Sequence, residues 1–224
     1  MNRCLVCSQY STEGEYHHRC LTSFFGLPRV PSLDLGVVTE QATQLGISAP
    51  GVMAKVPISL LGATFRAGSK ATSFLIKLPN KEYAYLPEYE HLTMHLASLG
   101  KIPTVEHALY RLEDGMLAYF TKRIDRIGDR KVAMEDFCQL GGRLTEDKYR
   151  SSYEQLGKIV KSHSRRLLDV VDLWYLLLFC FVTGNSDMHL KNFSLYAPNE
   201  EQYILRTDMI GTMALNTSVF ASMT

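Results

Sequence analysis

The sequence has almost no net charge and lacks a long apolar run. Its 24 lysines and arginines face 23 acidic residues, which leaves a formal charge of +1. This balance gives no reason to expect the concentrated basic patch that binds nucleic acids or anionic membrane surfaces. The most apolar run, Leu173 to Val182, is too short to cross a bilayer as a helix, and the first ten residues lack the apolar centre of a secretory signal. These absences predict a cytoplasmic protein that contacts neither nucleic acid directly nor a membrane.

Cysteine is scarce, and the five cysteines are an odd number, which argues against a disulfide framework. Two residues separate Cys4 from Cys7, and two separate His17 from Cys20, so the two pairs can together hold one ion from tight turns. The pattern predicts a structural Zn²⁺ site, because four protein ligands leave no open position for a substrate. His18 is a competing ligand. A chance cluster of reduced thiols is the alternative.

No internal repeat or low-complexity tract divides the chain, and its 224 residues, 46% of them apolar, are enough to bury one large core or two small ones. Short strand-type segments dominate up to about residue 126, and helical patterns dominate from residue 134. We therefore predict an α+β fold in three parts. Residues 1–30 form the cysteine motif, residues 31–126 form a lobe built on an antiparallel sheet, and residues 127–224 form a mainly helical lobe.

Turn signals and periodicity predict the elements of the two lobes. Arg66 to Lys70 has hairpin chemistry, so a turn is expected there between two strands, and Glu113 to Gly115 marks another turn. A further pair of short strands is expected near residues 193–196 and 203–205. The expected helices are 35–45, 86–99, 135–140, 151–163 and 167–182.

Polar chemistry is densest in the run 184–195, Gly-Asn-Ser-Asp-Met-His-Leu-Lys-Asn-Phe-Ser-Leu, which follows an apolar helical segment. Gly184 is a natural helix stop, because glycine takes the left-handed conformation at little steric cost. Asp187 and Asn192 are five positions apart, the spacing of the protein kinase catalytic loop. In that loop the acid orients the substrate hydroxyl and the amide binds a metal ion. The run therefore indicates phosphoryl transfer.

A lysine lies inside an apolar strand segment. Lys77 alternates with Phe74 and Ile76, so it points away from them, either into solvent or into a cleft. The helix expected next carries Glu88 and Glu90 near its start. A strand lysine paired with a carboxylate on the following helix is how kinases hold the nucleotide phosphates, which favours the cleft.

Two weaker signals accompany this pair. The small-residue loop from Ile47 to Lys55 precedes an apolar strand, and such loops turn backbone N–H groups toward phosphate oxygens, although an ordinary turn is the alternative. Asp208 follows the last expected strand, where a kinase places its main magnesium ligand. An ordinary turn aspartate is the alternative there.

Taken in order, these motifs resemble the HipA family of bacterial serine/threonine kinase toxins from toxin–antitoxin modules. The loop at 184–194 is the most specific part, and an N-terminal cysteine motif is seen in many HipA-domain proteins. The chain is more similar to the short HipT form, which works beside a separate small HipS protein. The segments that carry the resemblance are Ile47–Lys55, Phe74–Pro79, Glu88–His91, Lys122–Arg126, Glu135–Gln139 and Gly184–Ser194.

The resemblance implies a protein-kinase-like (HipA-type) fold of two lobes, with a helical C-terminal lobe that is incomplete relative to the family. The family pattern Pro-Ala-Tyr-Asp is Leu-Arg-Thr-Asp at 205–208 here. The implied activity is ATP- and Mg²⁺-dependent transfer of the γ-phosphate to a protein serine, with an aminoacyl-tRNA synthetase as the suggested substrate. The implied partners are a HipB-like antitoxin and a HipS-like small protein. The alternative is a truncated, catalytically impaired protein that binds a nucleotide or a partner.

The resemblance also implies the nucleotide-binding residues. Lys77 would contact the phosphates of ATP, and Glu90 would pair with Lys77, with Glu88 as the second choice. A loop before the first strand of the sheet would cover the phosphates. The residues of that loop implied to do so are Gly51, Val52 and Lys55.

The remaining implied roles fall on the polar run and the acid after it. Asp187 would align the substrate hydroxyl. Asn192 and Asp208 would hold Mg²⁺. His189 and Lys191 would steady the loop or the transferred phosphoryl group.

Overall fold

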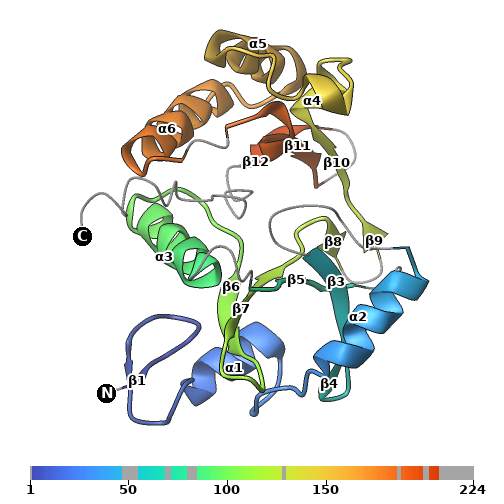
Figure 1. Ribbon diagram of the computed structural model, residues 1–224. Coiled ribbons are helices and arrows are strands. Elements are labelled where there is room, and N and C mark those ends of the chain that lie inside the picture. The colour runs from blue at the N-terminus through green and yellow to red at the C-terminus, as the bar shows by residue number, and fades with distance from the viewer. Residues whose placement is uncertain are drawn as a thin grey trace. The chain divides into compact units, whose positions relative to one another are not determined.

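The computed structural model describes residues 2–46, 55–68, 72–79, 85–127, 130–185, 188–198 and 202–206 (Figure 1). The chain divides into two compact units. The first unit comprises residues 1–91 and 106–129, and the second comprises residues 92–105 and 130–224. The helix α3 (Leu86–Leu99) is shared, because its first turns belong to the first unit and the rest to the second.

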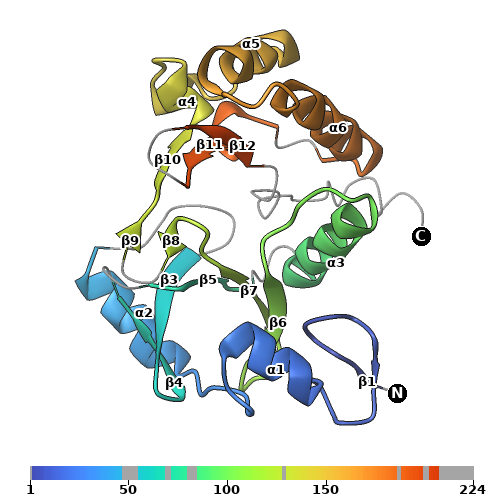
Figure 2. The same cartoon turned by 180° about the vertical axis from the view of Figure 1, so that it is seen from behind.

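An antiparallel sheet of five strands, ordered β4-β3-β5-β7-β6, forms the first unit. Alternation along β5 sends Phe74 and Ile76 to one face and Leu75 and Lys77 to the other. Figure 2 shows the sheet from the side opposite to that of Figure 1. The strands are β3 (Lys55–Leu61), β4 (Thr64–Ala67), β5 (Phe74–Lys77), β6 (His107–Arg111) and β7 (Leu117–Lys122), followed by the short β8 (Arg126–Ile127).

The first hairpin turns at Gly62 and Ala63. Leu61 and Thr64 are paired across it, and Gly62 has a φ of 62°, a conformation that glycine adopts at little steric cost. The hairpin predicted around residues 66–70 is wrong, because residues 66 and 67 belong to β4, and β4 pairs with β3 and not with β5. A two-residue loop with positive φ matches the twist of the flanking strands, so a glycine there decides the position of the turn.

One face of the sheet packs on two helices, α1 (His18–Phe25) and α2 (Leu35–Gln44), to form the hydrophobic core of the first unit. Phe65 and Phe120 lie at its centre with ring centroids 5.2 Å apart. Burying an aromatic side chain of this size stabilises the fold by about 1.5–3 kcal/mol. The aromatic members of the core are Tyr16, Phe24, Phe25, Phe65, Phe74, Tyr110 and Phe120.

The N-terminal segment lies against the edge strand β6. The Leu109 N–H donates to the Leu5 carbonyl at 2.7 Å, and the Tyr16 hydroxyl donates to the Leu109 carbonyl at 2.9 Å. Both groups would otherwise be exposed at the edge of the sheet, where another chain could pair with them. In residues 2–17, the described part of this segment, the regular secondary structure is the two-residue strands β1 (Asn2–Arg3) and β2 (Tyr10–Ser11).

The second unit combines a three-stranded antiparallel sheet, ordered β10-β11-β12, with helices. A helix was expected from residue 135, but residues 133–136 form a strand. Asp136 caps the helix that follows, because its side chain accepts the Gln139 N–H while the Gln139 side chain accepts the Asp136 N–H. The elements are β9 (Arg130–Lys131), β10 (Ala133–Asp136), α4 (Phe137–Leu140), η1 (Thr145–Asp147), α5 (Tyr153–His163), α6 (Asp169–Val182), η2 (Leu190–Asn192), β11 (Ser194–Ala197) and β12 (Ile204–Arg206).

The helix α6 has one buried and one exposed apolar side. Leu173 and Leu177 are buried, whereas Leu178, Phe181 and Val182 are exposed, Phe181 to 84%. An exposed apolar surface of this kind favours association with other apolar surfaces. Among the described helices, α6 included, none combines the length and apolar character needed to span a membrane.

Candidate functional site

Lys77 and Glu90 form a buried ion pair in the first unit. Lys77 is the last residue of β5 and is 3% exposed, while Glu90 lies on α3 and is 1% exposed. The Lys77 Nζ donates to Glu90 Oε1. The predicted ion pair is thus present, it is made by Glu90 and not by Glu88, and Lys77 points into the protein instead of into solvent.

The strands place a second lysine opposite the first. Lys55 on β3 and Tyr119 on β7 are the direct cross-strand partners of Lys77, so the three side chains share one face of the sheet. The Lys77 Nζ lies 5.4 Å from the centroid of the Tyr119 ring. Burial lowers the pKa of Lys77 well below its ordinary value, and the charge of Lys55 lowers it further. Two positive charges opposite each other destabilise a sheet, so this face favours an anion that neutralises them.

Two buried polar atoms on this face have no hydrogen-bond partner among the described residues. They are Glu90 Oε2 and the Tyr119 hydroxyl, and burial raises the pKa of Tyr119 well above its ordinary value. A buried polar group without a partner costs about 1–3 kcal/mol. Of the two, the Tyr119 hydroxyl can donate to a ligand oxygen, whereas Glu90 Oε2 can only accept a hydrogen bond.

Apolar residues anchor the polar run of the second unit. Leu190 is fully buried, and its N–H donates to the Lys148 carbonyl at 3.0 Å. The Phe193 ring stacks on the Phe137 ring at a centroid distance of 5.6 Å, and the Phe193 carbonyl accepts the Phe137 N–H at 3.0 Å. The loop is therefore fixed on both sides of the short helix η2.

The polar residues of η2 and its flank have defined surroundings. His189 is buried, with its ring edge-to-face with Tyr149 at 5.0 Å, and its carbonyl accepts the Asn192 N–H at 2.9 Å. Lys191 is exposed, with its Nζ 3.3 Å from Thr145 Oγ1 and 3.8 Å from a carboxylate oxygen of Asp136. These contacts suit the loop-steadying role that the resemblance implied for Lys191.

Several predicted site residues lie outside the described residues. They are Gly51, Val52, Asp187 and Asp208. Of the others, Lys55, Lys77 and Glu90 belong to the first unit, and His189, Lys191 and Asn192 belong to the second.

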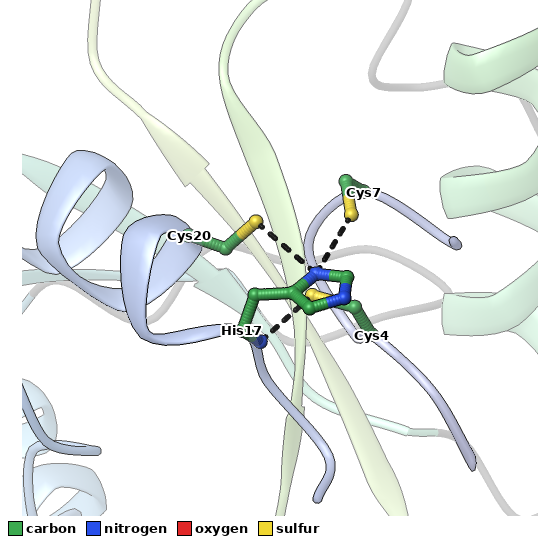
Figure 3. A group of neighbouring side chains, drawn as sticks. All are labelled: Cys4, Cys7, His17 and Cys20. Carbon is green, nitrogen blue, oxygen red and sulfur yellow. Dashed lines mark hydrogen bonds between the residues drawn. The ribbon is translucent and has the colours of Figure 1, made fainter. Parts of the chain in front are cut away.

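The four predicted zinc ligands form one cluster (Figure 3). Their ligand atoms all lie within 4.8 Å of one another. The Nδ1 of His17 is 3.4 Å from Cys7 Sγ and 3.8 Å from Cys20 Sγ, and its backbone N–H lies 3.5 Å from Cys4 Sγ. His18, the competing ligand, is exposed and lies outside the cluster.

The thiols of this cluster differ in acidity. Burial raises the pKa of Cys4, but hydrogen bonds from the N–H groups of Cys7, His17 and Val6 outweigh burial and lower it to about 7. Burial, followed by the neighbouring Cys7 and Cys4 sulfurs, raises the pKa of Cys20 to about 12. None of the five cysteines, all of which the structure describes, forms a disulfide.

Two arrangements of polar side chains were not predicted from the sequence. His91 follows Glu90 on α3, and its Nδ1 is 2.9 Å from His107 Nδ1 while its Nε2 is 3.1 Å from Ser8 Oγ. Histidines 16 residues apart on different elements give no local signal that they meet, so only the packing of α3 on the sheet shows the pair.

The second missed arrangement is the carboxylate at the start of α6. Asp169 is fully buried and accepts hydrogen bonds from the Ser164 hydroxyl at 2.5 Å, from the Leu205 N–H at 2.6 Å and from the Arg166 guanidinium. It therefore ties α6 to β12. An aspartate in the first turn of a helix is common, so nothing local distinguishes it from a solvated one.

Residues 47–206 match the family model of the HipA-like C-terminal domain. Among curated relatives, "Putative kinase Y4dM" of Sinorhizobium fredii is 32% identical over 150 residues, which cover 62% of this chain and 36% of the relative. A "Putative kinase" of Haemophilus influenzae is 26% identical over 207 residues, 85% of this chain and 59% of the relative. "Putative kinase Y4mE" of Sinorhizobium fredii is 30% identical over 185 residues, 76% of this chain and 43% of the relative. The chain thus spans less than two thirds of each.

Two solved structures share the fold. HipA from Shewanella oneidensis, in a complex with HipB and operator DNA, superposes with a TM-score of 0.61 at 19% identity, covering 75% of this chain and 47% of HipA. The proinflammatory kinase CtkA of Helicobacter pylori gives a TM-score of 0.50 at 14% identity, covering 74% of this chain and 55% of CtkA. These likenesses confirm the kinase-like α+β fold predicted from the sequence.

Proposed function

Since the chain belongs to the HipA-like C-terminal domain family, we propose that it is an ATP- and Mg²⁺-dependent serine/threonine protein kinase, the toxin of a HipA-type toxin–antitoxin module. The observation that carries the proposal is the buried ion pair of Lys77 with Glu90. A strand lysine held by a carboxylate on the following helix is the device by which kinases grip nucleotide phosphates. Catalysis then depends on positioning and charge stabilisation and not on a covalent intermediate.

In this proposal the sheet face of the first unit binds the triphosphate. Lys77 donates to phosphate oxygens, Glu90 holds Lys77 in place, and Lys55 adds a second positive charge from the neighbouring strand. The opposed lysines and the Tyr119 hydroxyl, a hydrogen-bond donor, support an anionic ligand. The loop of Gly51 and Val52 lies before β3 in the chain and is assigned to cover the phosphates.

In this proposal the polar run 184–195 and the acid after it align the acceptor hydroxyl and bind the metal. Asp187 aligns the substrate hydroxyl, while Asn192 and Asp208 bind Mg²⁺, for which amide and carboxylate oxygens are suitable donors. When bound, Mg²⁺ neutralises charge on the phosphates. The anchoring of Leu190 and the contacts of Lys191 keep Asn192 at a defined position.

The acceptor is proposed to be a protein serine, and the family resemblance suggests an aminoacyl-tRNA synthetase as its carrier. A HipB-like antitoxin is the proposed partner, which is supported by the HipA neighbour having been solved in complex with HipB. A small HipS-like protein is a further proposed partner, from the similarity to the short HipT form.

A second candidate function is a nucleotide- or partner-binding protein without turnover. It is favoured by the exposed apolar side of α6, which suits a partner surface. Both candidates use Lys77 and Glu90 for the nucleotide, so nucleotide binding alone does not separate them.

The test measures transfer and binding separately. Purified protein with labelled ATP and Mg²⁺ should phosphorylate itself or a co-purified synthetase, and Asp187→Asn should abolish the label. Equal labelling by the wild type and by Asp187→Asn would show that active kinase is wrong. A rise in Tm with ATP and Mg²⁺ that persists without transfer would then favour the binding protein.

A further inference from the structure

The cysteine cluster has the dimensions of a metal site. Ligand atoms around a tetrahedral Zn²⁺ with the usual Zn–S and Zn–N distances lie roughly 3.5–3.8 Å apart. The distances from His17 Nδ1 to the sulfurs of Cys7 and Cys20 are 3.4 and 3.8 Å. The remaining pairs stay within 4.8 Å. Three sulfurs and one imidazole nitrogen thus already converge on a common centre (Figure 3).

The histidine is oriented as a ligand. Its other ring nitrogen, Nε2, donates to the Tyr10 carbonyl at 2.9 Å, since a carbonyl oxygen can only accept. That hydrogen bond places the proton on Nε2 and leaves the lone pair of Nδ1 directed at the sulfurs. Metal-binding histidines are held in the same way by a backbone carbonyl on their second nitrogen.

The N-terminal segment, residues 2–17, has little regular secondary structure of its own. Its strands β1 and β2 have two residues each, and its contacts with the sheet include the hydrogen bonds between Leu5, Tyr16 and Leu109. A segment this small buries too little apolar surface for independent stability and usually needs a disulfide or a metal. Disulfides are absent from the cysteines of this chain, so a metal is the remaining cross-link of that kind.

We propose that Cys4, Cys7, His17 and Cys20 bind one Zn²⁺ in a closed structural site that fastens the N-terminal segment to the edge strand β6. The site has four protein ligands and therefore no position for a substrate. Cys4 and Cys7 lie between β1 and β2 in the chain, and His17 and Cys20 follow β2, so the ion closes the stretch that contains β2 into a loop. The proposal does not depend on kinase activity.

The experiment compares neighbouring histidines. The purified full chain is assayed for zinc by mass spectrometry and, after Co²⁺ replacement, for the absorption bands of tetrahedral thiolate-bound cobalt. Wild type and His18→Ala should each hold one zinc per chain and show these bands. His17→Ala should bind zinc at least tenfold more weakly. Cys7→Ser should behave like His17→Ala, whereas Cys138→Ala, which changes a cysteine of the second unit, should retain the metal.

Stability provides an independent readout. Removing zinc from the wild type with a chelator should lower Tm by roughly 5–10 °C, and added Zn²⁺ should restore it. If His17→Ala does not fold, His17→Cys offers four thiolates, and it should bind metal with a cobalt spectrum shifted by the fourth sulfur. Absence of bound zinc and of the cobalt bands in the wild type would overturn the proposal. Equal zinc affinity of His17→Ala and His18→Ala would overturn the ligand assignment.

Discussion

At the scale of one residue, the burial of the Lys77 side chain costs folding free energy at the position proposed to bind the nucleotide. Its ammonium group is buried beside Glu90, and a second lysine lies opposite it on the sheet. A buried ion pair contributes little net stability, because the desolvation of both charges offsets their attraction. Packing alone gives no reason for a lysine here, which is consistent with the proposed binding of the nucleotide phosphates.

Replacing Lys77 with methionine tests this directly. We expect the variant to lose ATP-dependent transfer and the ATP-induced rise in Tm. It should also be destabilised by about 3–5 kcal/mol in urea denaturation, because the Glu90 carboxylate remains buried without its cation. Adding Glu90→Gln should restore most of this stability and none of the activity.

The matched control is Lys122→Met. Lys122 pairs with Glu106 at the surface, where such a pair contributes about 0–1 kcal/mol. This variant should therefore keep both stability and nucleotide binding. An ATP-induced rise in Tm that persists in Lys77→Met would remove Lys77 from the phosphate site.

Asp125 is a single residue whose protonation should make the stability of the fold depend on pH. It accepts hydrogen bonds from Arg123 at 2.9 and 2.6 Å and from Arg126 at 2.7 Å. Burial raises the pKa of Asp125, but the hydrogen bonds and charges of the two arginines outweigh burial and hold it below the ordinary value of 3.8. The folded state therefore binds the proton less readily than the unfolded state does.

The direction in which stability changes with pH follows from this difference in proton binding. The stabilisation by Asp125 is fully present above the unfolded pKa near 4 and is lost as the pH falls through the lower folded pKa. We expect Asp125→Asn to be less stable than the wild type by about 1–3 kcal/mol at pH 7, with the gap closing below pH 4. Urea denaturation of both proteins at several pH values measures it. A gap that is independent of pH would contradict the assigned role.

At the scale of elements, single polar contacts decide how the helices of the second unit are held. The buried carboxylate of Asp169 accepts three donors and joins the start of α6 to the backbone of β12. Asp136 in turn ends β10 and begins α4 through its capping box. The helices are thus fixed at their first residues, and their apolar sides then complete the packing.

Two aspartates in the first turn of α6, Asp169 and Asp172, differ in how deeply they are buried. Asp169→Asn should destabilise the protein by about 3–5 kcal/mol, because it removes a buried charge paired with Arg166 and disturbs the donor set. Asp172→Asn should cost less than about 1 kcal/mol, because Asp172 pairs with the same arginine but its side chain is 41% exposed. Thermal unfolding of the two variants compares them. Equal losses would show that Asp169 does not anchor the helix.

On the scale of the whole molecule, the apolar side of α6 is the most unusual surface among the described residues. Val171, Leu178, Phe181 and Val182 are all more than half exposed. Natural monomers rarely leave so many large apolar side chains together in solvent. The same helix buries Leu173 and Leu177, so it carries more apolar side chains than its packing buries.

Replacing Leu178 and Phe181 together with glutamate should improve the behaviour of the protein in solution. We expect lower ANS fluorescence and less light scattering on concentration, with Tm changed by no more than a few degrees, because neither side chain is in the core. Leu177→Glu is the matched control and should unfold the protein, since it places a charge in the core. Unchanged ANS binding in the double variant would show that this side of α6 is not the exposed apolar surface.

Patterns among residues close together in the sequence were sufficient to predict much of the fold and of the candidate sites. Helical periodicity placed the helix 86–99 with the bounds that α3 has, because an amphipathic repeat is a property of consecutive residues. Spacing also brought together the four candidate zinc ligands, and the strand-lysine and helix-carboxylate arrangement of kinases paired Lys77 with Glu90. The hairpin was misplaced because several segments had turn chemistry, and only strand pairing selected Gly62 and Ala63.

Where two nearby residues could fill the same role, the tertiary structure decided which of them does. His17 has extended backbone and reaches the sulfurs, whereas His18 begins α1 and faces solvent. Glu90 and not Glu88 meets Lys77, because the packing of α3 decides which residue of its first turns faces the sheet. The sequence alone determined which chemical groups were available and at what spacing. Long-range packing decided which of them were buried, and therefore which were charged, paired and positioned to act.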